Sequence, residues 1–216
     1  MDAGEIGRLF TRADGSYLCA RWGRPIVPVV FGVEEATLRV IKGAVEAVVA
    51  LAGHRMAETD PELGANLMLF FVRDWDELRG VPNLDRLIDG LPGLVDRLEA
   101  AGANQYRLFR FDAAGAIRAC FVLLRMDAQL SALPAGTVAL SQAVQVILSW
   151  SDQAFAGASP LGMLGEVAVL RPGIAGVIRA AYDPVLPAVA RDASHALRLA
   201  ARVGAEEEGD GCGASV

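Results

Sequence analysis

The sequence predicts a mixed α/β protein, an α+β domain in which a small mixed sheet packs against helices. Three observations support this fold class. Short apolar runs typical of strands alternate with helical segments in the first half of the chain. Two neighbouring strand-like runs joined by a short turn form a β-hairpin. The second half is mainly helical, so the predicted order is β, α, β, α, β, β, followed by a helical C-terminal part.

The composition predicts one globular domain. The chain has 216 residues, of which 53% are hydrophobic and 21% are charged, and this suffices for a sizeable core. Disorder over the whole length is excluded, because disordered chains combine low hydrophobicity with high charge. The net charge of -6 and the lack of a basic patch argue against a nucleic-acid partner. We expect a single domain over residues 16–203, preceded by an N-terminal extension at residues 1–15.

The first β–α unit is predicted at residues 24–51. Residues 24–31 form a β-rich run, and Pro25 and Pro28 favour an edge strand because proline cannot donate a hydrogen bond to a sheet. Residues 34–51 carry apolar side chains at helical spacing and are predicted to form an amphipathic helix. Gly53 follows as a plausible C-terminal stop.

A buried central strand is predicted at residues 65–72. This run is almost continuously apolar, and its length and flanking turns favour burial on both faces of the sheet. Asp74 and Asp76 follow it and are interpreted as a turn and a helix cap rather than as paired catalytic carboxylates. Residues 84–100 are a weaker helical stretch, which we expect to break near Pro92.

The clearest pair of strands lies at residues 105–112 and 117–126. Both runs are rich in aromatic and branched residues, and the turn at 113–115 joins them as a β-hairpin. Residues 128–151 then contain no charged side chain. Within this segment, residues 137–150 are predicted to form a helix at the centre of the domain, because its polar groups are only amides and hydroxyls.

The C-terminal part is predicted to contain a loop at residues 155–165 and two helices at 174–181 and 186–203. Residues 204–216 are acidic and rich in glycine, and we expect this tail to be disordered. The chain contains no apolar leader segment and no run of 18 consecutive apolar residues. The sequence therefore predicts neither a signal peptide within this chain nor a membrane span.

The sequence contains no standard catalytic or metal-binding motif. His54 and His195 are the only histidines, and neither belongs to an HExxH motif. His54 is interpreted as a helix cap or solvated residue, and His195 as part of a solvated helix face. Ser159 lies in a loop that departs from the GxSxG pattern of serine hydrolases and is interpreted as a polar loop residue. We assign no catalytic residue and no metal ligand, and we expect no cofactor.

The three cysteines, Cys19, Cys120 and Cys212, are far apart in the sequence and form no CxxC pair. One disulfide is compatible with this number, and the sequence leaves the pairing open. Cys120 falls in a predicted strand, where a cysteine usually behaves as a small buried hydrophobic residue.

Four short motifs are spread over roughly residues 16–195. They are the stretch at residues 21–26, Asn66 in the predicted central strand, and the tripeptides at 170–172 and 182–184. These motifs resemble a bacterial family of unknown function. The resemblance implies a zincin-like, metallopeptidase-related layout, often found behind a secretion signal or lipid anchor. The compartment stays open, since the chain itself reads as cytoplasmic and the resembled family is often exported.

The resemblance extends to the uncharged helix. In that family the central helix commonly carries a glutamate and, three residues later, a glutamine. Here Gln142 occupies the position of the glutamate, Gln145 matches the glutamine, and Ser151 and Asp152 replace an Asn-Asp pair. A carboxylate can accept a proton from water and an amide cannot, so the departure argues against zinc-dependent hydrolysis. The resemblance therefore implies a degenerate zincin-like scaffold.

We expect a non-catalytic binding or interaction protein that holds a peptide or protein partner against a sheet edge by strand addition. The candidate cleft consists of Gln142, Gln145, Asp152, Tyr182 and Asp183. The alternative for the two glutamines is an internal role in capping loop backbone. A second hypothesis is a metallopeptidase-like hydrolase with a non-standard site that uses His54 or His195. A third is a structural subunit, and the oligomeric state is left open.

Overall fold

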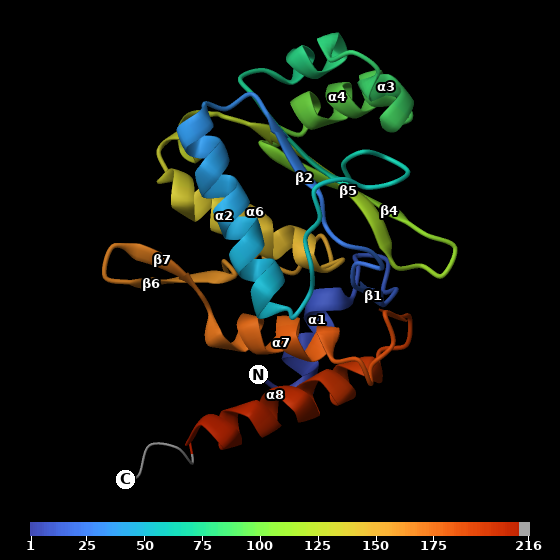
Figure 1. The fold of residues 1–216 in the computed structure, drawn as a ribbon, viewed down its shortest axis with the longest axis vertical. Helices are drawn as coiled ribbons and strands as arrows, with labels where there is room; N and C mark the ends of the chain where they lie inside the picture. Colours follow the sequence, from blue (N-terminus) through green and yellow to red (C-terminus); the bar gives the residue numbers. More distant parts are fainter. Residues whose placement is uncertain (212–216) are drawn as a thin grey trace.

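The computed structural model describes residues 1–211 of the chain. Its centre is a four-stranded mixed sheet with strand order β2-β3-β5-β4 (Figure 1). β2, β3 and β5 run parallel, and β4 is antiparallel to β5. The strands are β2 (Pro28–Phe31), β3 (Leu67–Val72), β4 (Gln105–Phe111) and β5 (Ile117–Arg125). The predicted mixed α/β class and the β4–β5 hairpin are confirmed.

The sheet follows the strand patterns of the sequence. All six residues of β3 are buried, because helices cover both faces of this central strand. β2 is an edge strand, as predicted, but it begins at Pro28 rather than at residue 24. After β2 the chain turns at Gly32, whose φ of +82° is a left-handed conformation. A Cβ atom at Gly32 would lie 1.9 Å from the Phe71 carbonyl oxygen, so this turn requires glycine.

The larger core lies on the face of the sheet that α2 (Glu35–Leu51) and α6 (Ala135–Ile147) cover. These two helices pack against each other, as Figure 1 shows. The amphipathic helix predicted at residues 34–51 is confirmed, and so is the burial of the uncharged helix. Below them lie α1 (Ala3–Phe10), α7 (Pro172–Tyr182) and α8 (His195–Gly211).

The smaller core lies on the opposite face, under η1 (Trp75–Gly80), α3 (Leu84–Leu87) and α4 (Leu91–Ala100). Asp74 is the N-cap of the 3₁₀-helix η1, and its backbone N–H donates to the Glu77 carboxylate at 3.0 Å. The interpretation of Asp74 as a cap is therefore confirmed. The helical break predicted near Pro92 is wrong, because Pro92 lies in the first turn of α4, where its missing N–H costs nothing. The break lies earlier, at Gly90.

Two predicted segments in the second half need correction. α6 is preceded by the short helix α5 (Ala128–Ser131) and ends at Ile147 rather than at residue 150. The following Leu148 forms a β-bridge with Arg21, which pulls the chain out of helical geometry. The predicted loop at 155–165 contains a strand, β6 (Leu161–Leu164), which pairs with β7 (Val167–Leu170) in a projecting hairpin (Figure 1).

The helix predicted at residues 186–203 is confirmed from His195 onward and wrong before it. Its first part forms β8 (Val189–Ala190), which pairs with β1 (Cys19–Ala20), and α8 begins only at His195. A two-stranded pairing with a segment so far away in the sequence outweighs the local helical pattern.

The two ends of the chain differ from a simple extension and tail. Residues 1–15 contain α1, which buries Ile6 and Phe10 in the larger core. The disorder predicted from residue 204 is wrong up to Gly211, because the backbone of α8 continues to that residue, and the rest of the predicted tail, 212–216, lies outside the described residues. None of the helices in the described part of the chain combines the length and hydropathy needed to cross a bilayer.

Candidate functional site

The five predicted site residues lie in two places. Gln145 and Asp152 line one cavity, together with the end of α6 and the edge strand β4. Gln142 lies one turn earlier on α6 and hydrogen-bonds to two of the side chains that line this cavity. Tyr182 and Asp183 stand at the end of α7 and do not line it. The structure thus brings together three of the five residues.

Tyr182 and Asp183 have partners within the fold. The Tyr182 hydroxyl donates to the Ile147 carbonyl at 2.9 Å and accepts from the Trp22 N–H at 3.3 Å. The Asp183 carboxylate forms an ion pair with Arg202 of α8. Both residues therefore tie α7 to neighbouring elements.

The cavity next to β4 has a volume of about 290 Å³. The side chains of β4 enter it because successive residues of a strand alternate between the two faces of a sheet. Arg107 pairs with Val122 and Phe109 with Cys120, and both partners lie in the core that α6 covers. The residues that shape the cavity are Gln105, Arg107, Phe109, Gln145, Trp150 and Asp152.

Arg107 is the centre of a buried polar network. Its Nη2 donates to Gln142 Oε1 at 2.8 Å and to Gln105 Oε1 at 2.9 Å. Gln142 Nε2 also donates to Gln105 Oε1, at 3.0 Å, and the Gln142 residue is only 2% exposed. Two amides therefore hold the guanidinium, and neither carries a charge.

The charge of Arg107 has no acidic partner. None of the ion pairs among the described side chains includes Arg107, and its Nε is completely buried without a hydrogen-bond acceptor. Burial lowers the pKa of Arg107 to about 10, while the nearby Cys120 thiol acts in the opposite direction. The guanidinium therefore keeps its proton at neutral pH, and a half-buried charge without an acidic partner remains beside the cavity.

The two glutamines play different roles. Gln142 is buried and its contacts are internal, as the alternative held, but its partners are side chains of β4 and not loop backbone. Gln145 is half-buried, and its Nε2 donates to Ser141 Oγ at 2.9 Å on the same helix. Asp152 is exposed at the mouth of the cavity.

Sequence reasoning missed Gln105 and Arg107. The available signal was the alternation in β4, where these two polar residues share a face with the apolar Phe109. A polar pair on the buried side of a strand predicts a buried network that needs partners.

The predicted environments of the histidines are partly wrong. His54 follows α2, is half-buried, and its Nε2 lies 2.9 Å from the Arg24 carbonyl oxygen. His195 is 4% exposed and faces the Tyr17 ring, so the predicted solvated helix face is wrong. The reason is that α8 packs beneath α1 at this end. Burial lowers the pKa of both imidazoles, and nearby arginines lower it further.

The remaining reactive groups occupy structural positions. Ser159 Oγ accepts from the Leu161 N–H at 3.1 Å in its loop, as its interpretation as a loop residue requires. Cys19 and Cys120 are free and buried, as expected for Cys120, whereas Cys212 lies outside the described residues. Among the side chains that the structure describes, no group of three or more from histidine, cysteine, aspartate and glutamate is placed to hold a metal ion.

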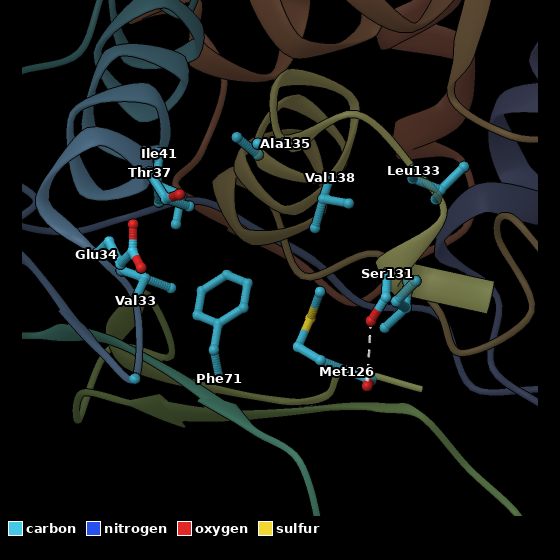
Figure 2. A pocket seen from close by; sticks show the side chains of 13 residues that line it. Val33, Glu34, Thr37, Ile41, Phe71, Met126, Ser131, Leu133, Ala135 and Val138 are labelled. Atoms are coloured by element: carbon cyan, nitrogen blue, oxygen red, sulfur yellow. Dashed lines mark hydrogen bonds between the residues drawn. The ribbon is translucent and has the colours of Figure 1, made fainter. Parts of the chain in front are cut away.

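A second cavity, of about 300 Å³, lies at the carboxyl ends of the parallel strands (Figure 2). Phe71 and Met126 form its floor, and the first turns of α2 and α6 flank it. Its polar side chains include Thr37 and Ser131, and the Ser131 hydroxyl donates to the Met126 carbonyl at 3.2 Å. Open α/β sheets often bind ligands in this position. The walls are mainly apolar and contain no histidine, lysine or arginine among their lining residues.

No similarity to a known protein helps to interpret this site. No family model, no curated protein and no solved structure matches the chain. The resemblance to a zincin-like family therefore stays a prediction, and functional inference depends on the geometry.

The motif residues that carried this resemblance support the fold. Asn66 is fully buried, accepts from the Val27 N–H at 2.8 Å and donates to the Pro25 carbonyl at 2.9 Å. The Arg21 guanidinium donates to the carbonyl oxygens of Ala181 and Asp183 at 2.9 and 3.1 Å. The motifs at 21–26 and 182–184 thus bind each other across the domain.

Proposed function

We propose that this protein is a non-catalytic binding protein that takes an extended segment of a partner protein as an added strand along β4. The observation that carries the proposal is the unpaired outer edge of β4, next to the Arg107 cavity. β4 is seven residues long, lies at the margin of the sheet (Figure 1) and leaves each of its residues at least partly exposed. An edge of this kind is a ready template for another strand.

The hydrogen-bond pattern identifies the free backbone groups. The Arg125 N–H donates to the Asn104 carbonyl at 2.9 Å, which fixes the alternation of bonded and non-bonded pairs in the antiparallel ladder. The N–H and C=O groups of Gln105, Arg107 and Phe109 consequently point away from β5. Within the described residues, no hydrogen bond from another element reaches these backbone groups.

The two edges of the sheet are not equivalent. β2 is four residues long and begins with a proline, which cannot donate to an added strand. β4 contains no proline and keeps a regular register up to the irregularity between Arg110 and Phe111. β4 is also the edge that lies beside α6, the helix against which the cleft was expected.

The test begins with selection of binders from a displayed library of random peptides of about 12 residues. Amide hydrogen exchange of the complex is then measured by NMR. We expect the amides of Gln105, Arg107 and Phe109 to slow strongly on binding. The amides of Tyr106 and Leu108 bond to β5 already, so they serve as internal controls with little change.

Two results would overturn this function. One is a library from which no peptide binds. The other is a bound peptide that leaves the three outward-facing amides unprotected, for example one that protects only residues around the apolar cavity in Figure 2.

The alternative is a hydrolase with a non-standard site. His54 contacts the Tyr182 ring and His195 the Tyr17 ring, and neither imidazole has a carboxylate hydrogen-bond partner among the described side chains. Incubating a selected peptide with the protein and following its mass distinguishes the two functions. An intact peptide is expected from a binding protein, and cleavage that is lost on substitution of either histidine would support the hydrolase.

A further inference from the structure

The cavity beside β4 is lined by Arg107, a half-buried cation that lacks an anion. Both hydrogens of Arg107 Nη2 are used by the two glutamine oxygens, whereas Nε has no acceptor. No hydrogen bond of Nη1 occurs among the described contacts. A buried charge left unpaired is strongly unfavourable, and it is usually compensated by a carboxylate or phosphate.

The cavity walls favour binding of an anion. Trp150 and Phe155 provide apolar surface, which lowers the local dielectric constant and strengthens an ion pair. Arg12 contributes a second guanidinium to the lining. Asp152 is the only carboxylate among the lining residues. It forms no ion pair with Arg107, so the charge of Arg107 is not neutralised from within the cavity.

We propose that this cavity is a carboxylate subsite, in which Arg107 binds an acidic group carried by the added strand. The assignment rests on the proposed function for its biological source. In a strand paired with β4, the residue opposite Arg107 places its side chain on the same face, with the two Cβ atoms about 4.5–5.5 Å apart. That side chain enters the cavity, so an aspartate or glutamate there reaches the guanidinium.

A carboxylate fits better than a phosphate. A carboxylate carries one negative charge and accepts charge-assisted hydrogen bonds from the N–H donors of Arg107 that the two glutamines leave free. A phosphate carries close to two negative charges and would be repelled more strongly than a carboxylate by Asp152 at the mouth. The carboxylate can come from an acidic side chain or from the C-terminus of the segment, and the experiment below separates these sources.

Gln142 holds the Arg107 guanidinium in place and leaves its positive charge available to a bound carboxylate. Its amide oxygen orients the guanidinium at 2.8 Å without neutralising it. The substitution Gln142→Glu would place a carboxylate at the same position and pair with Arg107 internally. This variant keeps the shape of the site and the bond accepted from Arg107, loses the bond that Gln142 Nε2 donates to Gln105, and removes the unpaired charge.

The first test uses acetate as the probe and the Nε–H NMR resonance of Arg107 as the readout. Sodium acetate is titrated at constant ionic strength against sodium chloride. We expect a saturable shift with acetate and none with chloride, and at least tenfold weaker binding in Gln142→Glu, which keeps the Arg107 resonance. Arg110→Gln is the matched control, because Arg110 lies on the opposite face of β4 and pairs with Asp89. A shift that is unsaturable, or equal in chloride, would overturn the subsite.

The second test uses peptides selected as described above. Changing the acidic residue of a peptide to its amide should weaken binding to the native protein about tenfold and leave binding to Gln142→Glu unchanged. If amidation of the C-terminus has this effect instead, the carboxylate comes from the chain end. Peptide binding without any acidic preference overturns the subsite and leaves strand addition standing. Acetate binding without any peptide binding overturns strand addition and leaves the carboxylate subsite standing.

Discussion

Replacement of Gln142 by leucine should destabilise the protein through the charge of Arg107. Gln142 is 2% exposed, and leucine has a similar volume and no polar atoms. The substitution therefore preserves packing, removes the acceptor of one Arg107 Nη2–H bond at 2.8 Å, and removes the donor to Gln105 at 3.0 Å. Gln105 Oε1 keeps its bond from Arg107, so the main loss is at the guanidinium.

The expected magnitude follows from these contacts. A hydrogen bond to a charged group contributes about 1.5–3 kcal/mol, and the apolar burial of leucine offsets part of the loss. We expect a net decrease of about 2 kcal/mol in the free energy of unfolding. In a protein of this size each kcal/mol changes the melting temperature by about 2–4 °C, so the expected decrease is about 4–8 °C.

Chemical denaturation and calorimetry measure this change directly. Gln145→Leu is the matched control, because Gln145 is half-buried on the same helix and bonds only to Ser141. The control should cost less than about 1 kcal/mol. Equal stabilities of Gln142→Leu and the native protein would refute the network, and so would an equally large loss in the control.

Three further predictions concern the fold. Gly32→Ala should cost at least about 2 kcal/mol, because its Cβ would lie 1.9 Å from a carbonyl oxygen, whereas Gly53→Ala, also at positive φ but with open space around it, should cost about 1 kcal/mol in denaturation. Burial alone would raise the pKa of Asp60, but two backbone N–H groups, Asn66 and Arg24 lower it to about 2. The resulting stabilisation, about 2 kcal/mol, is present above pH 3.8 and is lost as the pH falls towards 2, so Asp60→Asn should flatten the acid limb of a pH–stability curve. Burial lowers the pKa of both histidines, so stability should decrease below the unfolded value of about 6.5, and replacing both with glutamine should reduce this loss in melts between about pH 7 and 5.

Local patterns predicted the elements whose stability is decided by burial. The continuous apolar run of β3, the helical periodicity of α2 and the two runs of the β4–β5 hairpin each match one simple environment. Their side chains meet a core on the faces that the pattern requires.

The elements that sequence reasoning missed lack such a pattern. β6 and β7 are four residues each, pair only with each other, and expose Met163 and Leu164 by 66% and 73%. β8 is two residues long and exists because β1, far away in the sequence, offers it a partner. Pairing decides these segments, and local propensity does not.

The same limit applies to the site. The amides of α6 stood out because they interrupt an apolar helix, and the sequence located Gln142 correctly within a buried helix. Its partner, Arg107, is 35 residues away, and its side chain reaches α6 only because the register with β5 sets which face of β4 is buried. A single-residue shift of that register would turn Arg107 to the opposite core.

The amide at position 142 therefore has two separate consequences. On the resemblance to a zincin-like family, it removes a carboxylate that could accept a proton from water. On the contacts of this structure, it accepts a hydrogen bond from the Arg107 guanidinium at 2.8 Å without neutralising its charge. The acetate titration tests only the second consequence, because a glutamate at 142 would pair with Arg107 whether or not the scaffold ever held a metal.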